Sequence, residues 1–358
     1  MDNITSPINP SIILKNLLQV SGMSQKELAI RTGVTEKHIC NIIKGEKEIS
    51  DAFARKLSYA LPHSEDWAVL QAKYKAYQLK LEDENSISEE EINVLKQLKE
   101  IIGYCIEKKF MHNHCSDAEK VLQLRELLKI SDLTSIPKIT YNAAYRAQIS
   151  SNAKVNAYVL FAWQMLCEKE TESENVVTVL NKSLLKDKLN EIRSLMFDKI
   201  SDSCNALQQI LAECGIIFHI AHNFRGAPVQ GFIKPTSDNK LLLCLTIRRN
   251  RADIFWFTLF HEIAHVLHGD FATRFVDFES VETDIEAKAN KFARDILISP
   301  IVYRDFVQST TNFNWSAVLE LARRANVTPT IALGRLQKDE LVEWNLYSDK
   351  VERYQWVQ

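Results

Sequence analysis

The sequence has no uninterrupted apolar run of about 18 residues, the length at which a segment becomes a candidate membrane-spanning helix. The N-terminal segment MDNITSPINP is polar and lacks the charged and then apolar order of a signal peptide. The 7 cysteines are scattered without a C-x-x-C pair, which argues against a disulfide framework or a cysteine zinc site. We therefore expect a cytoplasmic protein with reduced thiols and no membrane contact.

The chain also lacks a strong net charge, because 44 Lys+Arg residues face 46 Asp+Glu residues, a net charge of −2. This balance excludes a global attraction to nucleic acid, so any basic binding surface must be local. With 358 residues, 46% of them hydrophobic, the chain can bury sizeable cores. Its length suggests two or three domains.

The segment His261-Glu262-Ile263-Ala264-His265 has the spacing of a zinc protease. Histidines four residues apart lie on one face of a helix, about 6 Å apart along its axis, so both imidazoles can bind one ion. The glutamate between them points toward a water on that ion. Residues 254–267 are apolar nearly all the way round, which predicts a buried helix. A core helix with two hydrogen-bonded histidines is the alternative, but the spacing favours a metal site.

A catalytic zinc takes three protein ligands and keeps one open position. Glu286 is the candidate third ligand: it opens a second amphipathic helix in which the small residues Ala289 and Ala293 would allow close approach to the first helix. His268 lies about 10 Å along the axis from the first histidine, too far for a straight helix to share an ion. Three acidic residues between the helices remain rivals: Glu279, Glu282 and Asp284.

The segment HEIAHVLHG, followed by an E-x-x-A-N-x-F-A helix that ends in proline, resembles the ImmA/IrrE metallopeptidases over residues 206–336. The resemblance implies that His261, His265 and Glu286 hold Zn²⁺ and that Glu262 is the general base. Two residues are candidates for a second oxyanion donor: His268 and Tyr303. Residues 344–356, rich in Trp and Tyr, remain unassigned.

Three short segments before this helix, 215–220, 231–234 and 241–246, are apolar and rich in β-branched residues. Turn residues separate them, which predicts a small antiparallel sheet. An extended substrate could add to the edge of this sheet as another strand. The arginines that follow, Arg248, Arg249 and Arg251, form either a solvated loop or a site for an acidic partner.

The first 80 residues predict a series of short helices. Ser24, Thr35 and Ser50 are the expected N-caps of helices at 25–31, 36–44 and 51–61. Two short helices joined through a glycine-containing turn form a helix-turn-helix, although an ordinary small helical bundle has the same pattern.

The segment MSQKELAIRTGVTEKHICNIIKGEKEIS resembles the lambda-repressor-like (XRE) DNA-binding domains, and LPHSEDWAVLQAKYKAYQLK is similar to the region that follows in HigA-type antitoxins. The resemblance implies that residues 35–44 are the recognition helix. Polar side chains suited to base edges or phosphates are the expected DNA contacts: Gln25, Lys26, Thr35, Lys37, His38 and Asn41. Residues 1–80 hold only 11 Lys+Arg against 8 Asp+Glu, so we expect binding to need two copies.

The middle of the chain is predicted to be helical and carries no motif whose spacing implies chemistry. Two S-x-x-E capping boxes open helices near 89–110 and 117–130: Ser88 with Glu91, and Ser116 with Glu119. His112, His114 and Cys115 could in principle bind a metal, but a loop between helices is the simpler interpretation.

Together the patterns predict a mainly α protein with a small antiparallel sheet (α+β), in three parts: a DNA-binding domain at 1–80, a helical connector at 81–205 and a zinc peptidase domain at 206–358. We expect a homodimer that binds an inverted-repeat operator in double-stranded DNA and cleaves a repressor, a partner protein or itself. The alternative is a HigA-like antitoxin and autorepressor whose zinc domain binds a toxin or senses a signal without proteolysis. A weaker alternative is a transcription factor with structural zinc.

Overall fold

The computed structural model describes residues 6–61, 63–139, 155–174, 176–236, 239–271 and 284–355. The chain divides into two compact units, one formed by Met1–Ile92 with Cys115–Leu122 and the other by Asn93–His114 with Gln123–Gln358. In the described parts of both units, no helix is long and apolar enough to cross a membrane. The three predicted domain boundaries remain predictions.

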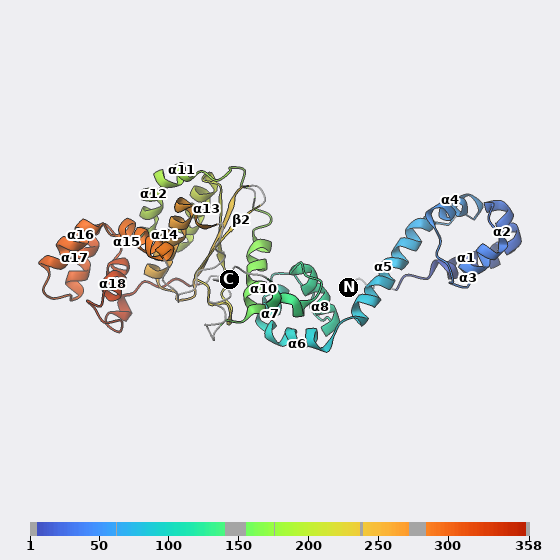
Figure 1. The fold of residues 1–358 in the computed structure, drawn as a ribbon, viewed down its shortest axis with the longest axis horizontal. Helices are drawn as coiled ribbons and strands as arrows, with labels where there is room; N and C mark the ends of the chain where they lie inside the picture. Colours follow the sequence, from blue (N-terminus) through green and yellow to red (C-terminus); the bar gives the residue numbers. More distant parts are fainter. Residues whose placement is uncertain are drawn as a thin grey trace. The chain divides into compact units, whose positions relative to one another are not determined.

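The first unit is built from short helices (Figure 1): α1 (Pro10–Ser21), α2 (Gln25–Thr32), α3 (Glu36–Ile43), α4 (Asp51–Ala60) and the longer α5 (Trp67–Asn85). The predicted N-caps are confirmed, because Ser24, Thr35 and Ser50 each accept a hydrogen bond from a backbone N–H three residues ahead. Gly33 adopts a left-handed conformation (φ 64°) in the turn between α2 and α3. The apolar faces of these helices meet in one core that includes the fully buried Leu28, Ile39 and Leu57.

The helical segments that follow in the described residues are α6 (Glu89–Gln97), α7 (Lys99–Glu107), α8 (Asp117–Leu127), η1 (Leu133–Lys138) and α10 (Ala157–Glu170). The predicted helix at 89–110 is wrong in one respect, because it is divided at Leu98 into α6 and α7. The capping box of Ser116 and Glu119 is confirmed: the hydroxyl of Ser116 accepts from the N–H of Glu119, and the Glu119 carboxylate accepts from the N–H of Ser116.

The sheet of the second unit follows α11 (Lys182–Asp187), α12 (Leu189–Ser194), η2 (Leu195–Phe197) and α13 (Ile200–Glu213). It contains β1 (Ile216–Ala221), β2 (Gly231–Pro235) and β3 (Leu241–Thr246) in the order β1-β3-β2. Strand β3 is parallel to β1 and antiparallel to β2. The predicted mainly α fold with a small sheet of three strands is confirmed, but the expectation that all strands are antiparallel is wrong for β1 and β3. The sheet is mixed. Every residue of β3 is buried, as expected for the central strand of the sheet. The apolar pattern of a strand does not reveal its direction relative to its neighbours, so the sequence could not predict the parallel pair.

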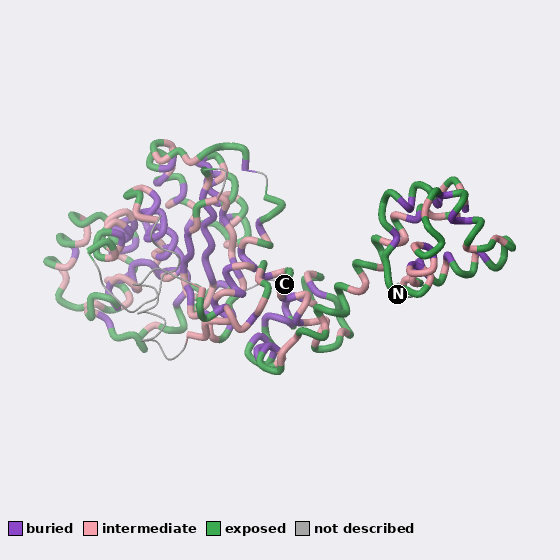
Figure 2. The backbone as a smooth tube through the Cα atoms, turned by 45° about the vertical axis from the view of Figure 1, so that its right-hand side comes forward, coloured by how far each residue is buried: buried purple, intermediate pink, exposed green. Residues whose placement is uncertain are grey.

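Helices cover both faces of the sheet. Leu241, Leu243 and Leu245 share a core with α14 (Ala252–His268) on one face. On the other face Phe232 meets Trp163 of α10 edge-on, at 5.5 Å between ring centroids. Figure 2 shows the resulting buried centre of the unit. The helix with the H-E-x-x-H spacing is thus a core helix, as its apolar surroundings predict.

The described residues after α14 contain α15 (Asp284–Leu297), α16 (Pro300–Ser309), α17 (Trp315–Ala325), α18 (Pro329–Lys338) and η4 (Ser348–Lys350). The C-terminal segment returns to the start of α14, where the N–H of Ala252 donates to the carbonyl of Glu352 and the N–H of Tyr354 donates to the carbonyl of Asn250. The hydroxyl of Tyr354 also accepts a hydrogen bond from the buried indole N–H of Trp256 at 2.8 Å. This previously unassigned segment therefore holds the N-terminal half of α14.

Candidate metal centre

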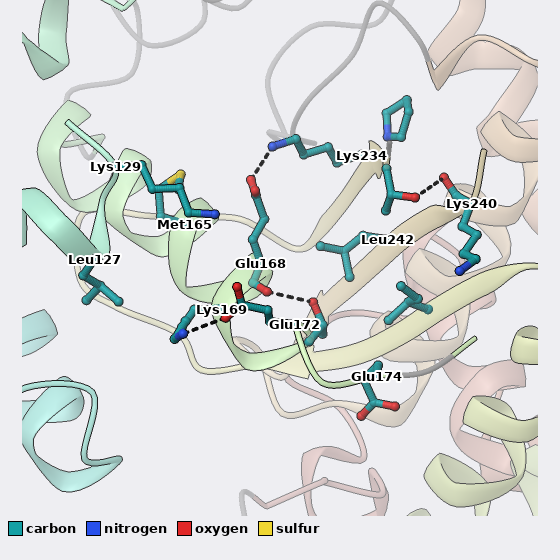
Figure 3. A pocket seen from close by; sticks show the side chains of 14 residues that line it. Leu127, Lys129, Met165, Glu168, Lys169, Glu172, Glu174, Lys234, Lys240 and Leu242 are labelled. Carbon is teal, nitrogen blue, oxygen red and sulfur yellow. Dashed lines mark hydrogen bonds and ion pairs between the residues drawn. The ribbon is translucent and has the colours of Figure 1, made fainter. Parts of the chain in front are cut away.

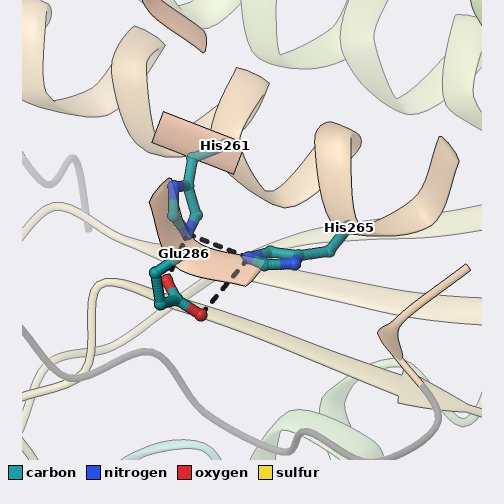
Figure 4. A group of neighbouring side chains, drawn as sticks. All are labelled: His261, His265 and Glu286. Carbon is teal, nitrogen blue, oxygen red and sulfur yellow. Dashed lines mark hydrogen bonds and ion pairs between the residues drawn. The ribbon is translucent and has the colours of Figure 1, made fainter. Parts of the chain in front are cut away.

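Three side chains from α14 and α15 converge at one point (Figure 4): His261, His265 and Glu286. The two Nε2 atoms lie 3.0 Å apart, and the Glu286 carboxylate lies 3.3 Å from His261 Nε2 and 3.8 Å from His265 Nε2. One potential ligand atom from each side chain falls within 4.8 Å of the others. Two imidazole nitrogens and one carboxylate oxygen are a donor set that zinc accepts. The three residues fit a single metal ion.

Close packing of two helices creates this convergence. Helix α14 packs against α15, and Ala289 and Ala293 of α15 are both fully buried. These small side chains permit the approach that brings Glu286, in the first turn of α15, to the histidines. Arg193 fixes the far end of α15, because its guanidinium donates to the carbonyl oxygen of Leu297 at 2.9 Å. The burial of both alanines agrees with the role predicted for them.

Each histidine has a second contact at its other ring nitrogen. Nδ1 of His265 lies 2.8 Å from Oδ1 of Asp270, and Nδ1 of His261 lies 3.0 Å from Oδ1 of Asn290. A carboxylate and an amide oxygen can only accept, so each Nδ1 is the donor in its contact. In a neutral imidazole this leaves the lone pair on Nε2, the nitrogen that faces Glu286 and would bind an ion. The sequence prediction missed Asp270 and Asn290. Asn290 stands one helical turn after Glu286, and that spacing could have revealed it.

Glu262 lies beside the triad in sequence but turns toward the sheet. Glu262 is 3% exposed to solvent, and its carboxylate lies against Gly231, the first residue of β2. One turn earlier in α14, the hydroxyl of Thr258 lies 3.3 Å from Oε1 of Gln230. The start of β2 is therefore packed on the Thr258 and Glu262 side of α14.

Among the described residues, the rival ligand Asp284 and the candidate oxyanion donors His268 and Tyr303 do not join the triad. His268 is exposed, with its ring near Phe292, and Asp284 is exposed at the start of α15. The Tyr303 hydroxyl donates to Asp339 at 2.6 Å, and burial together with this hydrogen bond raises the pKa of Tyr303. Two further rivals lie outside the described residues: Glu279 and Glu282. In the described parts of the chain, the triad is the one group of three or more His, Cys, Asp or Glu side chains close enough to share an ion, so His112, His114 and Cys115 form no such group.

At least one arginine of the predicted cluster, Arg251, has a structural role. Arg251 makes two hydrogen bonds of 2.9 Å to the carboxylate of Asp253 and one of 2.8 Å to Gln337, and its guanidinium lies 5.2 Å from the centroid of the Trp344 ring. A bidentate pair of this kind fixes both partners. Arg251 thus ties the N-terminus of α14 to α18 and the C-terminal segment, which leaves it little freedom to bind an acidic partner.

The six predicted DNA contacts all belong to α2, α3 or the residue that caps α3. Lys26, Thr35 and Lys37 are exposed, and Gln25, His38 and Asn41 are half-buried. The His38 ring packs edge-on against Phe53, at 5.2 Å between centroids. His38 therefore has a packing role within the unit in addition to its predicted contact.

A pocket of about 380 Å³ lies on the face of the sheet that α10 covers (Figure 3). Leu242 and Met165 form part of its wall, and Glu168 and Lys234 form an ion pair at its rim. Lys169 pairs with Glu172 beside it. Leu242 faces away from α14, so this pocket is separate from the metal centre.

No protein-family model matches this chain, and no curated protein has a significantly similar sequence. The geometry of the site therefore carries the functional argument.

Proposed function

We propose that the chain is a zinc-dependent endopeptidase. The observation that carries the proposal is the convergence of the buried His261 and His265 with the half-buried Glu286 on one point, with Glu262 on the same helix as the histidines. Zinc bound by such a set lowers the pKa of its water to about 7 and polarises a peptide carbonyl. Resemblance to the ImmA/IrrE metallopeptidases supports the same assignment.

Metal binding, orientation of the ligands and proton transfer are assigned to different residues of the site. His261, His265 and Glu286 would hold the ion, while Asp270 and Asn290 accept hydrogen bonds from the two Nδ1 atoms and so orient the rings. Glu262 takes a proton from the attacking water and passes it to the nitrogen of the leaving amine.

The sheet supports a polypeptide substrate. Strand β2 pairs with β3 along one side and is the end strand of the described sheet. Its first residue, Gly231, touches Glu262, so the strand leads directly to the proposed base. An extended peptide that hydrogen-bonds to the free side of β2 would pass beside Glu262.

We further propose that the first unit binds double-stranded DNA as a homodimer on an inverted repeat. The support is the pair of short helices α2 and α3, joined through the left-handed Gly33, with Lys26, Thr35 and Lys37 exposed. This arrangement suits a recognition helix that enters the major groove. A chain with both activities would be a regulator that cleaves a repressor, a partner protein or itself.

The test is to express the wild type, Glu262→Gln and the surface variant Glu213→Gln in the native host and to compare protein termini across the proteome. We expect one protein, encoded nearby or the chain itself, to be shortened with the wild type and with Glu213→Gln but not with Glu262→Gln. Zinc content and DNA binding should be equal in all three. A promoter that Glu262→Gln still derepresses, with no shortened protein in any strain, would contradict the peptidase and favour a HigA-like antitoxin.

A further inference from the structure

Gly231 has no backbone reason to be glycine. It is absent from the glycines with positive φ in the described chain, so an L-residue could adopt its conformation. It opens strand β2, where glycine has no side chain to pack and loses more conformational freedom than any other residue. In strands, such a glycine often marks a place where another group approaches closely.

The close group here is the carboxylate of Glu262. A Cβ atom added to Gly231 would lie 2.0 Å from Oε1 of Glu262, 2.6 Å from its Cδ and 2.7 Å from its Cγ. These distances are far below van der Waals contact, so any side chain at position 231 must displace Glu262 or the strand.

The strand has little room to retreat. The N–H of Thr246 donates to the carbonyl of Gln230 at 2.9 Å, and the Thr246 hydroxyl donates to the carbonyl of Val229 at 2.6 Å. These bonds fix the two residues before Gly231 to the residue that ends β3. The side chain of Glu262 must therefore move instead.

We propose that Gly231 is a positioning residue of the hydrolytic site: its missing side chain makes the slot in which the Glu262 carboxylate lies between α14 and β2. The role of Glu262 as base rests on the proposed function, whereas the contact between the two residues does not. A Cβ at position 231 would displace the Glu262 carboxylate from this slot. We expect the three proposed ligands to stay in place.

Two other glycines provide matched controls. A Cβ at Gly334 in α18 would lie 2.1 Å from Oδ2 of Asp253, a comparable clash that involves a different carboxylate. A Cβ at Gly103 in α7 would meet nothing within 4 Å. Gly334→Ala therefore measures the effect of a clash with a carboxylate other than Glu262. Gly103→Ala measures the effect of a glycine-to-alanine change that causes no clash.

The contact is tested by thermal unfolding of the full chain as Gly231→Ala, Glu262→Ala and the double variant. We expect Gly231→Ala to lower the melting temperature by roughly 3 °C or more in the wild type. In the Glu262→Ala background the loss should largely vanish, because the added methyl group occupies the vacated slot. Gly334→Ala should lower the melting temperature equally in both backgrounds. If Gly231→Ala alone does not fold and the double variant does, the coupling is supported. Equal losses from Gly231→Ala in both backgrounds would overturn the proposal.

The consequence for catalysis is tested with zinc-loaded protein and a pool of unstructured fluorogenic peptides. Gly231→Ala should keep the zinc content of the wild type, with kcat reduced roughly a hundredfold and KM little changed, because general base catalysis is worth about 10²–10⁴-fold. Gly103→Ala should retain full kcat. Wild-type kcat in Gly231→Ala would overturn the positioning role. A wild-type chain that cleaves no peptide would contradict the proposed function, and the unfolding experiment would then decide alone whether Gly231 positions Glu262.

Discussion

Nδ1 of His265 lies 2.8 Å from Oδ1 of Asp270, five residues further along the chain. Gly269 makes this contact possible, because its left-handed conformation (φ 83°) ends α14 and turns the chain back toward the histidine. The N–H groups of Gly269 and Asp270 both donate to the carbonyl of His265, which locks the turn. The end of the helix therefore supplies the carboxylate that orients one proposed metal ligand.

Asp270→Ala should weaken zinc binding without removing a ligand. Loss of a carboxylate behind a ligating histidine typically lowers metal affinity 10–100-fold, because the imidazole loses its fixed orientation and part of its basicity. Competition with a fluorescent chelator measures the affinity. The exposed Asp305 of α16 gives the control variant Asp305→Ala, which should bind zinc as the wild type does. Equal affinity of the two variants would show that Asp270 does not support the site.

His261→Ala, His265→Ala and Glu286→Ala should each abolish tight zinc binding, because two remaining ligands hold zinc poorly. Metal analysis of the purified variants measures this loss. Asp284→Ala, which removes an exposed carboxylate two residues before Glu286, should keep the zinc. Full zinc in Glu286→Ala would assign the third ligand to another acidic residue between α14 and α15.

Tyr354→Phe should destabilise the second unit through α14. The hydroxyl of Tyr354 accepts from the buried indole N–H of Trp256, so its removal leaves that donor unsatisfied, at about 1–3 kcal/mol of unfolding free energy. Urea unfolding followed by tryptophan fluorescence measures the change. Tyr59→Phe is the control, because Tyr59 is 91% exposed and should change the free energy of unfolding by less than about 0.5 kcal/mol. Equal stability of the two variants would show that the C-terminal segment does not hold α14.

If the first unit binds an inverted-repeat operator as proposed, Lys37→Ala and Asn41→Ala should reduce its preference for that site over random duplex, because these side chains lie on the proposed recognition helix. Lys26→Ala should weaken binding to both duplexes alike and make the affinity less sensitive to salt, as expected for a phosphate contact. Titration of labelled duplexes at several salt concentrations measures both effects. A uniform loss in all three variants would mean that α3 contacts only the DNA backbone.

Short-range periodicity made α14, α15 and the triad predictable. The placement of His261 and His265 on one face of one helix follows from the helical repeat alone. The choice of Glu286 over three acidic rivals also needed the small residues on its helix face and the family resemblance. The helix starts at Ser24, Thr35 and Ser50 follow from side-chain capping, which is equally local.

Features that depend on contacts between distant segments were not predictable. The direction of β1 relative to β3 is set by how the chain connects them and not by the apolar pattern of either strand. The contact of Gly231 with Glu262 joins a strand to a helix, and the contact of Tyr354 with Trp256 joins the C-terminal segment to the same helix. Neither the composition of the chain nor the spacing of its residues predicts which distant residues make contact. The role of Asp270 was only partly predictable. Gly269 predicts that the helix ends there, but it does not predict the direction of the next side chain.

X-ray absorption at the zinc edge, combined with metal analysis of the purified full chain, tests the central claim most directly. We expect about one zinc per chain with only nitrogen and oxygen neighbours at about 2.0–2.2 Å, as two imidazoles and one carboxylate require. We also expect the imidazole signature to disappear in His261→Ala. The chain holds 7 cysteines, so sulfur neighbours at about 2.3 Å are a real alternative. Sulfur in the zinc shell, or a chain that takes up no zinc, would contradict the metal centre at His261, His265 and Glu286.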